Sequence, residues 1–261
     1  MSSRTALRAA ALAVSALALT ACNDPGGAAA VSAAPSAPAS AAASAPAGKP
    51  SAPASAAAAD HGLDSPPPGQ ARVAGLALLP WEWGNGFKES GKPSEDTSLA
   101  LPALDASCHL TGSTPVKGLT GRMQRTVELP SPAGTGVSVF GWSEAEVFGS
   151  ADASHRDFAD TRAGAKRCPA YTDDASGDRF SGVHEVKAPS VAGADEVYAE
   201  EGTGVFVLAD GKKSDPLPYV LLVARKGEVT FDVYADIDDG RGIAAARTYA
   251  GEAMRTLAIK F

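Results

Sequence analysis

The chain has 261 residues, of which 44% are hydrophobic but only 6% aromatic, and its formal net charge is −7. All 16 aromatic residues (8 Phe, 5 Tyr and 3 Trp) lie from Trp81 onward, so the segment able to build a core is about residues 71–261, long enough for one domain. Only three of the 23 basic and three of the 30 acidic residues precede that segment, which makes it acidic and argues against nucleic-acid binding and attraction to anionic lipid.

The N-terminus has the parts of a lipoprotein signal peptide in the expected order. Two arginines precede an uncharged apolar run over residues 9–19, which is shorter than the ~20 apolar residues that span a bilayer. The run ends in Leu19-Thr20-Ala21-Cys22, which resembles a bacterial lipobox. The resemblance implies that residues 1–21 are removed and that Cys22 carries acyl chains such as palmitate, anchoring the protein to the cell membrane on its extracytoplasmic face. An ordinary signal peptide with an incidental cysteine is the alternative.

A low-complexity segment follows the lipidation site. Residues 22–70 consist mostly of Ala, Pro, Ser and Gly, with no aromatic residue and little to pack. Prolines recur too often for a helix, so we expect a disordered or polyproline-like linker between the anchor and the domain at residues 71–261. Serines in this segment are candidate glycosylation sites, but a plain linker is the simpler interpretation.

The folded segment begins with a region that predicts few regular elements. Residues 76–87 contain a proline and a Gly-Asn-Gly turn, which argue against a long element. Residues 88–107 are polar and loop-like, with a short helical turn expected near Ala103. Two strands are predicted next, at residues 121–129 and 136–148.

A helix is predicted after Ser150, whose side chain suits the N-cap position. Phe158, Ala165 and Cys168 are spaced to share one helical face, and Pro169 ends the helix. Cys168 therefore faces the core in the last turn, where it can join the helix to the segment around Cys108.

The two cysteines of the folded segment predict a disulfide. Lipidation accounts for Cys22, which leaves Cys108 and Cys168 as an even pair in an exported, oxidising setting. Metal binding or redox chemistry by two isolated cysteines is the weaker alternative, because neither lies in a Cys-x-x-Cys motif.

The last third of the chain is rich in predicted strands, which are expected at residues 182–188, 195–200, 203–209, 218–226 and 228–237. The last of these alternates apolar and more polar residues, as in a sheet with one buried face, and Lys226-Gly227 predicts a hairpin turn before it. Residues 241–258 predict an amphipathic helix. Together these elements predict an α+β fold, a single domain with an antiparallel sheet and flanking helices.

One stretch of this pattern resembles a known family. Phe148-Gly149-Ser150 followed by a helix ending near Cys168, Gly193-Ala194-Asp195-Glu196 before a strand, the paired strands around Arg225-Lys226-Gly227-Glu228, and the final Ala-rich helix are similar to the extracellular domains of mycobacterial serine/threonine kinases and related small lipoproteins. The resemblance implies a sensing or ligand-binding module with a cleft, and it implies no catalytic residue.

Three short segments resemble functional motifs only in part. Residues 86–93 have the spacing of a phosphate loop, but Pro93 occupies the position of the magnesium-binding Ser or Thr. Ser143 has neighbours resembling those of an esterase nucleophile but lies within a predicted strand, where we expect it to face solvent. Residues 236–240 resemble the start of a calcium loop but lack its later Gly and Glu, so an acidic turn capping the last helix is preferred.

The histidines and tryptophans give no clear site. No zinc-binding spacing is present among His61, His109, His155 and His184. Trp81, Trp83 and Trp142 could line a ligand pocket or pack in the core, and core packing is the more common role of such residues.

The leading hypothesis is a membrane-anchored extracytoplasmic lipoprotein, a non-catalytic module that binds or senses an unknown small molecule or envelope partner. No catalytic residue, cofactor, metal or nucleic-acid partner is expected. A carrier of a lipid or other apolar molecule and an envelope hydrolase with an unrecognised site are the alternatives. An enclosed apolar cavity would favour the carrier, and a Ser–His–acid or paired-carboxylate cluster in a cleft would favour the hydrolase.

Overall fold

One large sheet, covered on both faces, organises this protein. The computed structural model describes residues 69–91, 94–132, 136–208 and 210–260. Cys22, the signal peptide, His61 and the linker as far as residue 68 lie outside these residues, whereas Gln70, the last residue assigned to the linker, begins the first helix. Across the described ranges no helix is long and apolar enough to cross a membrane.

The helices are α1 (Gln70–Val73), the 3-10 helix η1 (Pro80–Glu82), α2 (Ala151–Arg167) and α3 (Ile243–Ala258). The strands are β1 (Lys88–Glu89), β2 (Glu95–Asp96), β3 (Ala100–Leu104), β4 (His109–Pro115), β5 (Leu119–Pro130), β6 (Val137–Phe148), β7 (Ala170–Asp173), β8 (Arg179–Glu185), β9 (Glu196–Val205), β10 (Leu217–Lys226) and β11 (Val229–Ile237). Within the described residues these eleven strands form one sheet, in the order β1-β5-β6-β11-β10-β9-β8-β7-β4-β3, with β2 also paired to β5.

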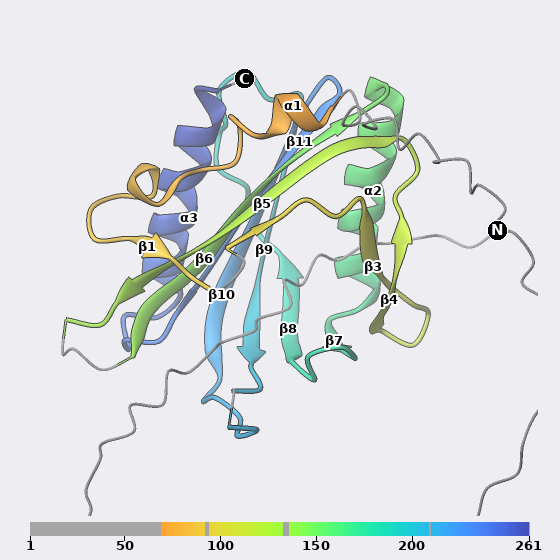
Figure 1. Cartoon of the computed structure of the whole chain (residues 1–261). Helices are drawn as coiled ribbons and strands as arrows, with labels where there is room; N and C mark the ends of the chain where they lie inside the picture. The colour runs from red at the N-terminus through yellow and green to blue at the C-terminus, as the bar shows by residue number, and fades with distance from the viewer. Residues whose placement is uncertain (1–68, 92–93, 133–135, 209, 261) are drawn as a thin grey trace, which may run out of the picture. The chain divides into compact units, whose positions relative to one another are not determined.

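The pairing is antiparallel except between β4 and β7, which run parallel. The predicted α+β single domain with an antiparallel sheet and flanking helices is therefore confirmed. Figure 1 shows α3 on one side of the strands and α2 on the other.

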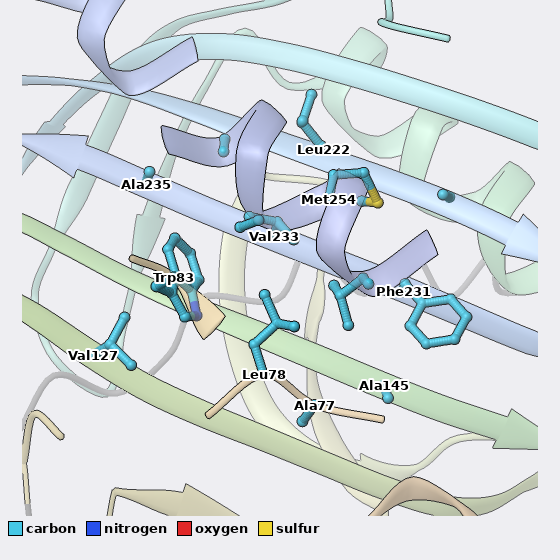
Figure 2. Packing of buried hydrophobic residues seen from close by; sticks show 14 of the residues in the cluster. Ala77, Leu78, Trp83, Val127, Ala145, Leu222, Phe231, Val233, Ala235 and Met254 are labelled. Carbon is cyan, nitrogen blue, oxygen red and sulfur yellow. The ribbon is translucent and has the colours of Figure 1, made fainter. Parts of the chain in front are cut away.

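The face beneath α3 is almost wholly apolar. The odd-numbered residues of β11, such as Phe231 and Val233, pack with Met254 of α3 and with Leu78 and Trp83 of the segment before β1 (Figure 2). Close packing over Gly141 is required here, because a Cβ at that position would lie 2.8 Å from the Trp83 ring. The apolar stripe predicted for residues 241–258 is thus the face that α3 buries.

The face beneath α2 combines aromatic and polar side chains. Stacked or edge-to-face rings run across it, and their centroids lie 4.5 Å apart for Tyr171 and Phe180, 5.3 Å for Tyr219 and Tyr234, and 5.6 Å for Tyr234 and Trp142. All of β11 is therefore buried, and the prediction that only one face of this strand is buried is wrong. The even positions of β11 are more polar because they face a polar, aromatic layer rather than water.

Several element boundaries differ from the sequence prediction. The helical turn expected near Ala103 is instead β3, because pairing with β4 stabilises an extended chain there. The strands expected at residues 195–200 and 203–209 are one strand, β9, which continues through Gly202. That glycine does not break the strand but makes room for Tyr219, since a Cβ there would lie 2.7 Å from its ring.

Smaller shifts occur elsewhere. The strand expected at residues 182–188 begins three residues earlier as β8, and the sequence pattern does not predict β4 or β7. The β10–β11 hairpin turns at Gly227-Glu228 rather than at Lys226-Gly227, since Lys226 still pairs with Val229. Gly227 has φ +56°, a conformation that favours glycine.

The predicted disulfide between Cys108 and Cys168 is present, with the two Cα atoms 5.6 Å apart. Ser150 caps α2 as expected, accepting a hydrogen bond from the backbone N–H of Ala153, and Cys168 lies at the C-cap rather than in the last turn. The bridge ties the end of α2 to the segment before β4. In the chain-entropy model a loop of this length contributes about 4 kcal/mol to stability.

Candidate functional site

A groove opens on the α3 side of the sheet and is the candidate ligand site. Its volume is about 440 Å³, and its lining comes from α3, the strands β9 and β10, and the segment that follows β8. This volume falls within the range of small-molecule pockets in proteins. We call it the α3 groove. Its walls are Lys187, Pro189, Glu201, Arg247, Gly251 and Arg255.

The groove arises because one helix is narrower than the sheet it covers. An α-helix with its side chains is about 10 Å across, roughly the width of two strands. Here α3 packs chiefly on β11 and β10, while residues 186–191 lie beside β9, where the backbone N–H of Val186 donates to the carbonyl of Ala199. The gap between α3 and residues 186–191 remains open and forms the groove.

The floor of the groove is apolar. Ala199 of β9 and Val220 and Leu222 of β10 form it, and each is at most 3% exposed. They lie there because the pairing of β9 with β10 places Ala199 opposite Leu222 on the α3 face. Val186 of the adjoining segment completes this surface.

The rim is cationic. Lys187 lies on one wall, and Arg247 and Arg255 lie on α3, eight residues apart along one face of the helix. Glu201 is the acidic residue of the lining and receives two hydrogen bonds from Arg247, including one of 2.7 Å from Nη2. This contact raises the pKa of Arg247 and fixes its guanidinium at the edge of the groove.

Gly251 opens the α3 wall between the two arginines. A glycine inside a helix is about 1 kcal/mol less favourable than alanine, so its presence needs a reason. Helix packing gives none, because a Cβ there would meet only Nη1 of Arg255, at 3.7 Å. The missing side chain instead leaves space above the apolar floor.

The residues considered for enzymatic chemistry do not converge. Ser143 lies in β6 as predicted, but it is fully buried rather than solvent-facing, and its Oγ accepts a hydrogen bond from the backbone N–H of Leu78 (2.9 Å). The part of the phosphate-loop match that the structure describes is a turn leading into the exposed β1. Pro93, at the position that decided against the motif, lies outside the described residues.

The histidines within the described ranges lie at separate places. His109 contacts Asp174 and His155 contacts Glu196, each at 2.7 Å, while Nδ1 of His184 lies 2.8 Å from the carbonyl of Gly182. No group of His, Cys, Asp and Glu in this part of the chain could hold a metal ion.

The tryptophans do not line a common pocket. Trp83 and Trp142 belong to the cores on opposite faces of the sheet, and Trp81 is 71% exposed on η1. Core packing is therefore correct for Trp83 and Trp142.

The prediction that an acidic turn caps the last helix is wrong. Asp236 is buried at the end of β11, Asp239 binds its neighbour Arg241, and the N-cap of α3 is Gly242, with no side-chain cap. Gly242 has φ +70°, which a capping Asp would adopt only with strain.

Two carboxyl groups beneath the α2 face have strongly raised pKa values. Burial raises the pKa of Glu200 from 4.5 to about 7, although the hydroxyls of Tyr198 (2.7 Å) and Tyr219 (3.2 Å) donate to it and oppose the shift. Burial likewise raises the pKa of Asp236 to about 8. Both side chains are enclosed among aromatic rings, so we assign them to the polar core.

The sequence analysis did not predict the groove, although the residues of its α3 wall have an unusual spacing in the sequence. Arg247, Gly251 and Arg255 recur every four residues in a helix, and a glycine flanked in this way on one face departs from normal helix composition. The residues of the floor could not be identified in this way, because the pattern around Ala199, Val220 and Leu222 predicts only buried positions in strands.

Comparisons with known proteins concern the fold alone. No model of a known family matches the chain, and no curated protein matches it. The extracellular domain of PknH from Mycobacterium tuberculosis is similar in structure, with 15% identity, coverage of 73% of this chain and 97% of that chain, and a TM-score of 0.47. An uncharacterised Mycobacterium smegmatis protein, the Rv0999 ortholog, has 12% identity, coverage of 67% and 90%, and a TM-score of 0.35.

Replacing Gly251 with alanine should stabilise the protein. The change restores helix propensity, and the added methyl group meets only the end of Arg255, so we expect the free energy of unfolding to rise by about 0.5–1 kcal/mol. Urea denaturation followed by circular dichroism measures this. A loss of stability would show that an atom of the protein occupies the space above Gly251.

The raised pKa of Glu200 predicts a pH-dependent stability. Between pH 4.5 and about 7 the unfolded carboxyl ionises while the folded one keeps its proton, so this group makes the free energy of unfolding fall by about 3 kcal/mol as the pH rises through that window. Asp236 adds a fall of the same sign. Urea titrations at pH 4.5 and 7.5 should therefore show a smaller fall for Glu200→Gln than for the unmodified chain. An equal fall in both proteins would contradict the assignment.

Proposed function

We propose that this chain is a membrane-anchored extracytoplasmic lipoprotein whose domain binds a small molecule without transforming it. The observation that carries the binding function is the α3 groove, an apolar floor under a cationic rim beside a helix glycine that nothing else explains. The lipobox at Cys22 and the Cys108–Cys168 disulfide support the location, because the first directs export and the second suits an oxidising compartment.

The shape of the groove favours recognition over the two alternatives. A carrier would enclose its cargo in a sealed apolar cavity, whereas the α3 groove is open along one side and has charged walls. A hydrolase would need an accessible nucleophile, and Ser143, the serine that the sequence singled out, is buried against Leu78. Native mass spectrometry of the protein purified from its host tests the binding function. We expect a co-purified molecule, and repeated isolation of a ligand-free chain would count against it.

The anchor is tested by replacing Cys22 with alanine in the living host. We expect Cys22→Ala to incorporate no labelled palmitate, because the acylated sulfur is gone, and to be secreted or to remain unprocessed. Cys108→Ala is the matched control and should keep the label, since its sulfur forms the disulfide instead. A Cys22→Ala chain that is fully processed and still fractionates with the membrane would refute the anchor.

A further inference from the structure

We propose that the α3 groove binds a single-chain anionic amphiphile, a molecule with one carboxylate or phosphate head group and one alkyl or acyl chain. This inference rests on the proposed binding function and specifies the chemistry of its ligand. Three features of the groove carry it, namely the balance of charge at the rim, the apolar floor, and the space above Gly251.

The rim carries more positive charge than the described residues of the protein neutralise. Lys187 is exposed and has no ion pair within the part of the chain that the structure describes. Within the described ranges, the ion pair of Arg255 is with its helix neighbour Glu252. The nearest atoms are 4.0 Å apart and both side chains are more than half exposed, so this contact has little strength. Arg247 alone is fully paired, with Glu201. Three cations and one acid therefore meet at this groove in a chain whose net charge is −7.

That imbalance selects an anionic head group. A carboxylate or phosphate between the walls would accept charge-assisted hydrogen bonds from Lys187 and Arg255, which a neutral ligand cannot do. Because Glu201 already holds Arg247 in place, the rim is partly ordered before a ligand arrives, and less side-chain entropy is lost on binding.

The interior of the groove selects an apolar body. Ala199, Val220 and Leu222 offer no side-chain polar group to a ligand, and the apolar Val186 and Pro189 beside them are still exposed to water. A small, fully hydrated anion would leave that apolar surface uncovered. An alkyl chain lying against Val186 and Pro189, above this floor, would remove their apolar surface and its own from water. The gap at Gly251 lets the chain pass the α3 wall. A free anion matches only the rim, and an uncharged hydrocarbon matches only the floor.

The test measures binding of defined probes to the mature chain, residues 22–261, with Cys22→Ser so that no acyl chain of the protein competes. Isothermal titration calorimetry would compare laurate and dodecyl phosphate, below the concentrations at which they form micelles, with inorganic phosphate and dodecanol. We expect the two amphiphiles to bind one per chain, and each lone half to bind at least about ten-fold more weakly.

Variants locate the site. Lys187→Gln and Arg255→Gln should each weaken laurate binding by about five-fold. Gly251→Leu should abolish binding by filling the groove, while Gly251→Ala should retain it. Arg156→Gln, which removes an exposed arginine from α2 on the other face of the sheet, is the matched control and should bind as the parent does. Circular dichroism shows whether each variant is folded.

The contrary outcomes are distinct. Phosphate binding as tightly as dodecyl phosphate would overturn the proposal in favour of a simple anion site, and equal binding of dodecanol would overturn it in favour of an uncharged ligand. Binding only to phosphatidylcholine vesicles that contain phosphatidylglycerol would indicate a membrane surface and also overturn it. If no probe binds but native mass spectrometry finds another molecule, the ligand class is wrong and the binding function stands. If no probe binds and native mass spectrometry finds no bound molecule, both the ligand class and the binding function are refuted.

Discussion

The width of a helix relative to the sheet beneath it governs the architecture of this domain. The α3 face must be shielded from water because it is almost wholly apolar, yet one helix covers only about two strands. Separate elements therefore share the task. The segment around Leu78 and Trp83 covers β6 and β5, and α3 covers β11 and β10. Residues 186–191 begin beside β9, and Val191 joins the same apolar cluster. A seam between two such covers is where a ligand can reach the apolar layer without unfolding the protein.

The two faces of the sheet consequently have different roles. Beneath α2, stacked aromatic rings enclose Glu200 and Asp236, and the disulfide fixes the end of the helix, so this layer is closed and its ionisable carboxyl groups are held inside. Beneath α3 the layer is apolar, and the basic side chains of the groove lie at the rim, where they remain exposed to water. Polar groups that a ligand can use are therefore on the α3 side, while those beneath α2 act on stability and its dependence on pH.

Local patterns in the sequence account for much of this fold. The cap at Ser150, the inward face of α2 that ends at Cys168, and the stripe of α3 follow from spacing alone, and all are present. Long-range pairing explains what spacing could not. Residues 100–104 become a strand only because β4 lies beside them, and β9 passes through Gly202 only because Tyr219 fills that space. The groove depends on which strands α3 leaves uncovered, which no local pattern encodes.

The most direct test of this account uses the alternation of side chains along β10. In a methyl-labelled sample titrated with laurate, nuclear magnetic resonance reports Val220 and Leu222 on the α3 face separately from Leu221 and Val223 on the α2 face. The account predicts that the first pair shifts as the ligand binds while the second pair changes little. Shifts confined to Leu221 and Val223 would contradict it, because they would place the ligand on the opposite face of the sheet.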